Sequence, residues 1–456
     1  MAIYYEKQLT FSDLVFQEII DPKHKLSKLA AIIDWAEIHG RLYRYYSNVG
    51  RQALPIRLMV GLHFLKHMEN MSDAECVDRI RGDLYWMAFC GVDASGLKDK
   101  FVHLERTSMI KFRNRIGEKG FAEVEAVITE YLIKEKHIDK KQMCTDSTSM
   151  EKNVAYPLDS HLLSKGRENL LKGIRKLEEC GVKGIDGLRT YSRRAKQIII
   201  TLMKLGKDRA ERIEAGTLEL SRQAVHMIHQ CEEMIQNAEK AVAKGNLQFK
   251  ESVRASGTIQ YLKEQKTLLR RVITQARKRF DGEHIPNKVY SLHEPQVIVI
   301  RKGKRSKTNE YGSKVNISIC KNGFIASHEL YHDNRHDAEL LEPALKNWEE
   351  KVGELPKQLN ADRGYQQKEK NLKRGKVKNI AKLCIPRTGK TKHPDHDKSW
   401  FRNGQRRRAG IEAVIGHLKQ DHRLGKCYYS GYRGDGINLT LGCSAWNLGK
   451  LARVMG

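Results

Sequence analysis

The feature that most constrains the fold is a long helical segment without proline, set between two segments of different character. Residues 160–282 contain no proline and are rich in Lys, Arg, Glu, Leu and Ile. Stretches such as SRRAKQIIITLMKL repeat apolar residues with helical period. From about residue 288 the pattern changes to the period of two typical of strands. We therefore expect an all-helical insertion within a mixed α/β protein. The sequence leaves open whether it is a spacer, a dimer arm or a DNA clamp.

The first 140 residues have the pattern of several short helices. Pro55 precedes the apolar-periodic stretch IRLMVGLHFLKHM, and Ser72 with Glu75 forms a capping box. Ser108 precedes another short helix, MIKFRNRI. Its cations are Lys111, Arg113 and Arg115. Two interpretations stay open: a helix-turn-helix type of DNA-binding domain, or a plain helical bundle with a solvated basic face.

The strands follow a recognisable order. Residues 143–150, MCTDSTSM, favour a strand that holds Asp146, and QVIVI predicts a second. KVNISICK, Asn322-Gly323 and FIASHELY predict a hairpin, in which Asn-Gly supplies the two positive-φ residues of a type I′ turn. A helix from about Asp337 to Lys351 and a strand ending at Asp362 come next.

The end of the chain is expected to alternate between helices and strands. A helix over QQKEKNLKR, a strand over NIAKLCIP and a last helix from about 403 to 422, holding Glu412, complete the order. Without the insertion this is the order of a ribonuclease H-like mixed sheet. We expect a helical N-terminal DNA-binding domain at 1–140, a catalytic domain at 141–160 and 286–456, and the insertion at 161–285.

Composition narrows the classes of partner. The 456 residues carry 83 Lys plus Arg against 55 Asp plus Glu, a net charge of +28. Such a basic surface attracts polyanions, of which nucleic acid is the usual one. A ribosome-associated or membrane-surface protein is the alternative on charge alone. Nine scattered cysteines without a Cys-x-x-Cys pair predict neither a disulfide framework nor a zinc ribbon. With no apolar span and no signal sequence, we expect a cytoplasmic, nucleoid-associated protein.

Three acidic residues are the candidates for chemistry. Asp146 lies in a strand that otherwise looks buried, where a charge is costly unless it binds something. Asp362 ends the strand expected beside it, and Glu412 lies on the last helix. In a ribonuclease H-like sheet these positions converge, and three carboxylates there suit two magnesium ions roughly 3.5–4 Å apart. Mn²⁺ is expected to substitute for Mg²⁺.

The last predicted helix carries polar residues along one side. At about 100° per residue, one stripe is formed by Gln405, Arg408, Glu412 and Lys419. The cations of the stripe are placed to bind phosphates. A plain salt bridge between Arg408 and Glu412 is an alternative interpretation of these two residues of the stripe. Residues 368–408 hold 15 Lys plus Arg and predict a DNA-facing surface.

Other acidic residues are interpreted structurally. We expect Asp159, after Tyr156-Pro157, to be an exposed turn residue, Asp337 to cap a helix, and Asp435 to lie in a turn. The crowded loop at 393–397 is expected to be a polar loop, because its ligand spacing matches no zinc site.

Three stretches resemble the active-site regions of bacterial insertion-sequence DDE transposases. They are CTDSTSMEKNVAYPLDSHLL (144–163), ADRGY (361–365) and RRRAGIEAVIGHLKQDHRL (406–424). Residues 42–91 resemble an InsH-type N-terminal domain, which points to the insertion-sequence-five family. The family pattern of tyrosine, two residues, arginine, three residues, glutamate, six residues and lysine matches here at Arg408, Glu412 and Lys419. Gln405 stands at the tyrosine position, a departure that affects that contact but not the metal ligands.

The resemblance implies a function. Asp146, Asp362 and Glu412 would be the metal-binding catalytic triad of a transposase that cleaves element ends and joins the 3′ hydroxyls to target DNA. The DNA contacts are expected from Arg406, Arg407, Arg408, Lys419, Gln405, Lys111, Arg113 and Arg115. Terminal inverted repeats and target duplex are the expected partners, bound by a homodimer. The alternatives are a structure-specific nuclease and a non-catalytic, transposase-derived DNA-binding protein.

Overall fold

The protein consists of two compact units. The computed structural model describes residues 18–47, 49–50, 53–92, 103–204, 209–301, 309–366, 375–387 and 392–455. One unit comprises residues 1–153 and 298–456, and the other comprises 154–297. Each unit is described by itself below. The smaller unit contains the whole of the predicted insertion, whereas the division of the larger unit into two domains stays a prediction.

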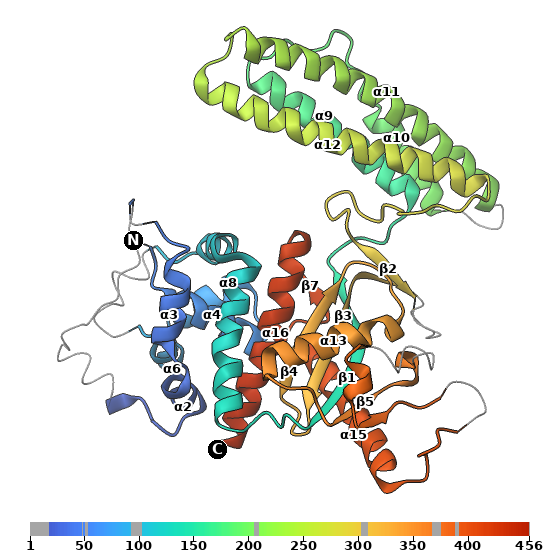
Figure 1. Ribbon diagram of the computed structural model, residues 1–456. Coiled ribbons are helices and arrows are strands. Elements are labelled where there is room, and N and C mark those ends of the chain that lie inside the picture. Colours follow the sequence, from blue (N-terminus) through green and yellow to red (C-terminus); the bar gives the residue numbers. More distant parts are fainter. Residues whose placement is uncertain are drawn as a thin grey trace. The chain divides into compact units, whose positions relative to one another are not determined.

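The smaller unit is helical, as the proline-free segment predicts (Figure 1). Its helices are α9 (Asp159–Glu179), α10 (Ser192–Met203), α11 (Arg209–Ala243) and α12 (Phe249–Phe280). Helices α9, α11 and α12 pack against one another around buried apolar residues. Gly166 and Gly173 of α9 lie against Leu269 and Leu262 of α12, where a Cβ atom would come within 2.5 and 2.3 Å of leucine side-chain carbons. The two glycines thus permit close approach of α9 and α12.

Asp159 stabilises this helical unit from within. It is the first residue of α9 and is only 3% exposed. Its carboxylate lies 3.2 Å from Arg279 and 3.6 Å from Lys288, and it accepts a hydrogen bond from Gln275 at 3.0 Å. The expectation of an exposed turn carboxylate is therefore wrong, because the cations that compensate Asp159 come from residues more than a hundred positions away.

The larger unit begins with short helices and one long one. They are α2 (Lys25–Ile32), α3 (Trp35–Tyr43), α4 (Ile56–Met68), α5 (Asp73–Ile80), α6 (Leu84–Phe89) and α8 (Arg106–Lys134). The capping box of Ser72 and Glu75 is confirmed at the start of α5. The short helix predicted after Ser108 is the first part of α8, which continues beyond a kink at Gly117, where φ is 61°.

A mixed sheet forms the rest of the larger unit. Its strands are β1 (Gln142–Lys152), β2 (Ile298–Arg301), β3 (Asn309–Cys320), β4 (Ile325–Tyr331), β5 (Gln358–Ala361), β6 (Lys382–Cys384) and β7 (Lys426–Cys427). The order is β2-β3-β1-β5-β6, with β4 also paired to β3 and β7 to β1. Strand β3 runs antiparallel to β1, whereas β5 is parallel to β1 and β6 to β5. The prediction of a mixed α/β chain with a helical N-terminal region is confirmed.

The β3–β4 hairpin forms as predicted, but its turn differs. Gly323 has a φ of 78°, whereas Asn322 is not among the described residues with positive φ. The amide of Gly323 donates to the carbonyl of Cys320 at 2.9 Å, and the amide of Cys320 donates to the carbonyl of Phe324 at 2.9 Å, so residues 321–323 form the loop. The type I′ assignment is therefore wrong. A three-residue loop needs only its last residue in the left-handed region, and glycine fills that position.

The two faces of the sheet are covered by different helices. Alternate residues of a strand point to opposite faces. Met143 of β1 belongs to the core that includes α13 (Asp337–Val352), whereas Cys144 packs in the core with Ile411 and Val414 of α15 (Ser399–Asp421). Because Asp146 is two residues beyond Cys144, it points to the same face as α15. The helix predicted over 366–374 lies outside the described residues apart from Gln366.

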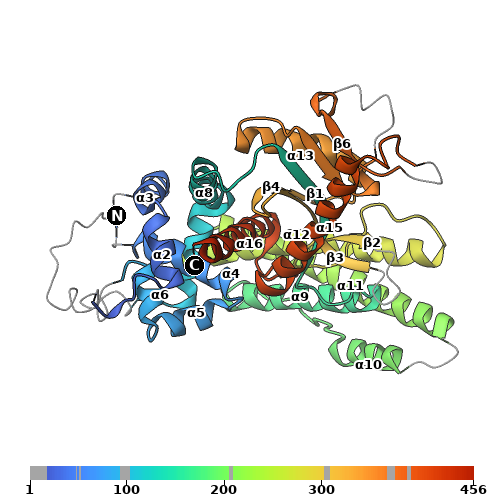
Figure 2. The same ribbon diagram turned by 90° about the horizontal axis from the view of Figure 1, so that it is seen from below.

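The last helix of the chain, α16 (Gly431–Val454), is central to the larger unit. It packs against α8, α4 and β4 (Figure 2). The interpretation of Asp435 as a turn residue is wrong, because Asp435 lies buried in α16 with its carboxylate 2.6 Å from Lys152. Among the described residues, no helix combines the length and apolar composition needed to span a bilayer.

The cysteines of the chain lie in its cores. All nine are buried free thiols. They contribute apolar volume to the cores rather than covalent links.

Candidate active site

Strand pairing places Asp146 and Asp362 side by side. Strands β1 and β5 are parallel, and the last paired residues are Thr145 and Ala361. Asp146 is the next residue of β1, and Asp362 directly follows β5. The parallel pairing therefore places the two carboxylates side by side, at the point where β5 ends.

The turn after β5 holds Asp362 in place. Asp362 caps the short helix Arg363–Tyr365, and its side chain accepts a hydrogen bond from the amide of Arg363 at 2.6 Å. Tyr365 is fully buried and donates its hydroxyl to the side-chain oxygen of Asn316 on β3 at 2.5 Å. The segment ADRGY thus combines a carboxylate with a buried aromatic anchor for its loop.

Helix α15 brings Glu412 to the same place. Its apolar side, with Ile411, Val414 and Leu418, is buried against the sheet, and this fixes the rotation of the helix. One guanidinium nitrogen of Arg408 lies 2.7 Å from Glu412, 3.7 Å from Asp146 and 3.9 Å from Asp362. We refer to Asp146, Asp362 and Glu412 as the carboxylate cluster.

The three carboxylates differ in exposure. The side chain of Asp146 is 16% exposed, that of Asp362 50% and that of Glu412 62%. Burial raises the pKa of Asp146 to about 6, against the opposing effect of Arg408 and with a further increase from the negative charges of Asp362 and Asp337. The cluster is thus open to solvent on one side and carries an excess of negative charge.

The donor set suits a hard divalent cation. Carboxylate oxygens are the ligands that Mg²⁺ and Mn²⁺ prefer. In the described ranges, no three His, Cys, Asp or Glu side chains already stand as a metal-binding group. In the carboxylate cluster all three carboxylates face the guanidinium of Arg408. Its Nε is buried and has no hydrogen bond to any described residue.

A fourth carboxylate lies close to the cluster. Asp337, the first residue of α13, accepts a hydrogen bond from Ser147 at 2.7 Å and lies 2.6 Å from Lys314. Its predicted role as the helix cap is taken by His336, whose side chain accepts from the amide of Ala338. The sequence pattern around Asp337 indicates only a helix cap. Its contact with β1 could not be predicted, because that contact depends on the tertiary packing of α13.

Two residues of the stripe on α15, Gln405 and Lys419, contact strands of the sheet. Gln405 donates to the carbonyl of Cys384 on β6 at 3.0 Å, Arg407 contacts Gln142, and Lys419 lies 3.5 Å from the hydroxyl of Ser149 on β1. Arg406 is exposed. Gln405, at the position of the family's tyrosine, is thus in contact with β6. Of the basic stretch 368–408, residues 368–374 and 388–391 lie outside the described residues.

The cations of α8 have different surroundings. Lys111 is exposed, and Arg115 is exposed with its guanidinium 4.7 Å from the centre of the Tyr46 ring. Arg113 is buried, with two nitrogens bound to Asp73 at 2.9 and 2.6 Å. This burial argues against Arg113 as a direct DNA contact, because its guanidinium is already paired inside the protein.

Two models of known protein families match the chain. Residues 14–115 match the family model described as a transposase domain (DUF772), and residues 243–448 match the model described as a transposase DDE domain. The chain belongs to the DDE transposases of insertion sequences. The DDE match includes Asp362 and Glu412 but begins after β1, so it leaves Asp146 outside.

One relative extends this similarity. The transposase is 33% identical over 190 residues to a protein of Rhizobium meliloti described as the uncharacterised ORF8 in the nfe locus. The match covers 40% of the transposase and 85% of that relative. No solved structure matches the chain.

Proposed function

We propose that the transposase binds the ends of its insertion sequence, hydrolyses phosphodiester bonds there and joins the freed 3′ hydroxyls to target DNA. In this proposal the catalytic part is a ribonuclease H-like domain. The order β4-β3-β1-β5-β6, with β5 and β6 parallel and β3 antiparallel to their neighbours, supports it. A homodimer would hold the two element ends.

Asp146, Asp362 and Glu412 would hold the divalent cations. When bound, Mg²⁺ or Mn²⁺ would lower the pKa of the attacking water or hydroxyl and stabilise the leaving oxygen. The residues of the chain place the DNA. Arg408 and Lys419 would contact phosphates beside the cleaved bond, with Arg406, Arg407 and Gln405 on the same helix. Water attacks phosphorus in the first step and the 3′ hydroxyl does so in the second, so no covalent link between protein and DNA is required.

The convergence of the carboxylate cluster carries the proposal. Three acidic side chains from β1, the turn after β5 and α15 point at one cation, although 50 residues or more separate them along the chain. A protein that only bound DNA would gain nothing from an excess of carboxylate near a phosphate surface. The same excess is what a metal-dependent nuclease requires.

The test is DNA cleavage by purified full-length protein. The substrate is plasmid DNA that carries the sequences flanking the gene, where short inverted repeats are expected. Wild type is expected to nick at the repeat boundaries with Mg²⁺ and not with EDTA. Asp146→Asn, Asp362→Asn and Glu412→Gln should each abolish cleavage and retain DNA binding, because each removes a ligand charge with little change in volume.

Glu350→Gln is the matched control, since Glu350 is an exposed glutamate on α13 that pairs with Lys346 outside the cluster. It should cleave as wild type does. Near-normal cleavage by any of the three cluster variants would remove that residue from the ligand set. Cleavage without joining to a target plasmid would favour a nuclease, and binding without cleavage would favour a transposase-derived binding protein.

A further inference from the structure

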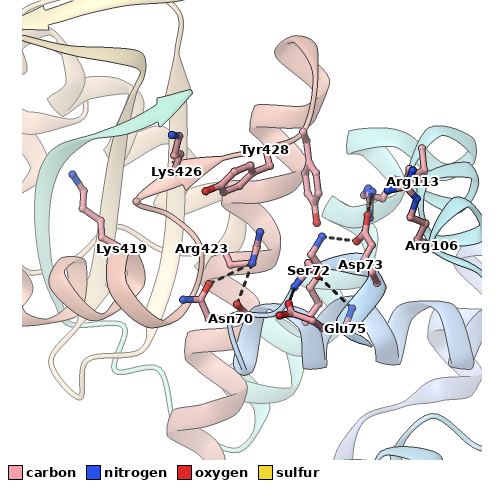
Figure 3. A pocket seen from close by; sticks show the side chains of 15 residues that line it. Asn70, Ser72, Asp73, Glu75, Arg106, Arg113, Lys419, Arg423, Lys426 and Tyr428 are labelled. Carbon is pink, nitrogen blue, oxygen red and sulfur yellow. Dashed lines mark hydrogen bonds and ion pairs between the residues drawn. The ribbon is translucent and has the colours of Figure 1, made fainter. Parts of the chain in front are cut away.

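A second charged site lies on the same unit as the carboxylate cluster. A cavity of about 810 Å³ is bounded by the end of α4, the start of α5 and α8, the end of α15 and β7 with the residues after it (Figure 3). We refer to it as the basic groove. Its lining includes Asp73, Arg106, Lys419, Arg423, Lys426 and Tyr428. The N-terminal helices and the sheet region each supply one wall.

The floor of the basic groove holds two buried cations and one carboxylate. Lys66 lies 2.5 Å and Arg113 lies 2.6 Å from Asp73. The Tyr429 ring contacts both cations, with its centre 4.6 Å from Lys66 and 4.3 Å from Arg113. Burial lowers the pKa of Lys66 to about 8, so it stays largely charged at neutral pH. The floor therefore keeps an excess of one positive charge.

The rim of the groove adds further cations and an exposed aromatic ring. Arg106 and Lys426 are exposed, and the guanidinium of Arg423 donates to the carbonyl of Asn70 at 3.1 Å. Tyr428 is 59% exposed, and its ring centre lies 5.5 Å from Arg423 and 5.8 Å from Lys426. Figure 3 shows Tyr428 beside the cations of the sheet-side wall, across the groove from Arg106.

These features match the chemistry of unpaired DNA. Basic side chains attract phosphates, and an exposed aromatic ring gives a base a surface on which to stack. A cavity of about 810 Å³ has room for a single nucleotide. The groove also adjoins the helix that carries Glu412, because Lys419 lines the groove and lies seven residues beyond Glu412 on α15.

We propose that the basic groove binds an unpaired nucleotide of the DNA end, with its base on Tyr428 and its phosphates held by Arg106, Arg423 and Lys426. This inference rests on the proposed function and specifies the form of DNA that the protein takes beside its cleavage site. A frayed or cleaved end offers such a nucleotide, while an intact blunt duplex does not. The groove then distinguishes an opened end from continuous DNA.

The test compares two fluorescent probes in EDTA, so that no cleavage occurs. One is a blunt duplex, and the other has the same duplex with a short single-stranded tail. Full-length wild type should bind the tailed probe more tightly. Tyr428→Ala should weaken binding of the tailed probe by about tenfold, as expected for the loss of one base stack, and leave the blunt duplex unchanged.

Two control variants keep the result specific. Tyr43→Ala removes another exposed tyrosine, 40% exposed on α3 and outside the groove, and should bind both probes as wild type does. Tyr428→Phe keeps the ring and should also behave as wild type. A tail carrying 5-iodouracil should crosslink to the peptide that contains Tyr428.

Equal affinity of wild type for the two probes, or an equal loss on both probes in Tyr428→Ala, would overturn the inference. So would a crosslink confined to other peptides. These outcomes are distinct from failure of the proposed function. A wild-type protein that cleaves with metal but binds the two probes equally would reject the groove alone. A tail preference that depends on Tyr428, in a protein that never cleaves, would reject the cleavage proposal alone.

Discussion

The carboxylate cluster and the floor of the basic groove have opposite imbalances of charge. In the cluster one guanidinium, that of Arg408, faces three carboxylates. In the floor one carboxylate, that of Asp73, faces two buried cations. Both sites adjoin α15, the first through Glu412 and the second through Lys419.

In each site the sign of the unpaired charge indicates which ligand the site suits. A site with surplus carboxylate suits a metal cation, and a site with surplus ammonium and guanidinium suits phosphate. The two sites also differ in the solvent exposure of their charged side chains. Glu412 is 62% exposed, whereas Lys66 is 2% exposed and depends on its partner to be tolerated inside the fold.

The largest expected effect on stability is in the floor of the groove. Asp73→Asn leaves Lys66 and Arg113 buried without their anion, and should lower the free energy of unfolding by about 3–5 kcal/mol. Glu412→Gln, by contrast, changes an exposed side chain and should stay within about 0.5 kcal/mol of wild type. Urea unfolding of both variants measures the contrast.

Asp78→Asn is the control for this pair, because Asp78 is 79% exposed on the same helix as Asp73. It should be as stable as wild type. Equal losses in Asp73→Asn and Asp78→Asn would show that the buried pairs contribute no more than a surface charge.

The second prediction concerns the pH dependence of stability without metal. The pKa of Asp146 is about 6 in the fold, above its ordinary value of 3.8, because burial disfavours the charged form. The resulting destabilisation begins as the pH rises through 3.8 and is complete above 6. Asp146→Asn does not titrate. In EDTA, its free energy of unfolding should rise relative to wild type by about 3 kcal/mol between pH 4 and pH 7. A constant difference across this range would contradict the shift.

The third prediction concerns Arg408 as the cation of the cluster. Arg408→Ala removes a positive charge that a metal ion must displace, so the affinity for Mn²⁺ without DNA should rise by about tenfold. Cleavage should fall, because a phosphate contact is lost. Calorimetric titration measures the affinity. The control is Arg406→Ala, which removes an exposed arginine two residues earlier and should leave the affinity for Mn²⁺ unchanged. If the affinity were unchanged in Arg408→Ala as well, competition between the guanidinium and the metal would be excluded.

The smallest expected effect is on the salt dependence of DNA binding. With a net charge of +28, binding to duplex should weaken steeply as salt increases. Lys419→Ala should reduce the slope of log affinity against log salt by about 0.9, the contribution of one phosphate contact, with little change in melting temperature. The control for the loss of one lysine is Lys346→Ala, which removes an exposed lysine on α13. A large drop in the melting temperature of Lys419→Ala would assign the residue a structural role.

Much of the site could be predicted because it depends on local pattern. Asp146 lies within a β-patterned stretch and Asp362 directly follows another. Parallel pairing of these strands then brings the two together. Glu412 and Arg408 are one helical turn apart, so their contact follows from helix geometry alone.

The features that the sequence did not reveal depend on partners distant in the chain. The sequence pattern places Arg113 on a basic helix face, whereas in the structure its guanidinium contacts Asp73 and Tyr429. Helix α16 was missed because glycines at its start resemble a turn, and because its packing against α8, α4 and β4 involves residues distant in the chain. The basic groove joins residues 66–113 with 419–429, which no local pattern connects.

Locating the bound metal tests directly whether the carboxylate cluster is the metal site. With Fe²⁺, ascorbate and peroxide, a bound iron generates hydroxyl radicals that cut the polypeptide close to the metal site. If the carboxylate cluster binds the metal, cuts are expected beside Asp146, Asp362 and Glu412, and excess Mg²⁺ should suppress them and Asp362→Asn should abolish them. Cuts confined to other segments, such as the His393–Asp397 loop, would contradict the assignment of the carboxylate cluster as the metal site.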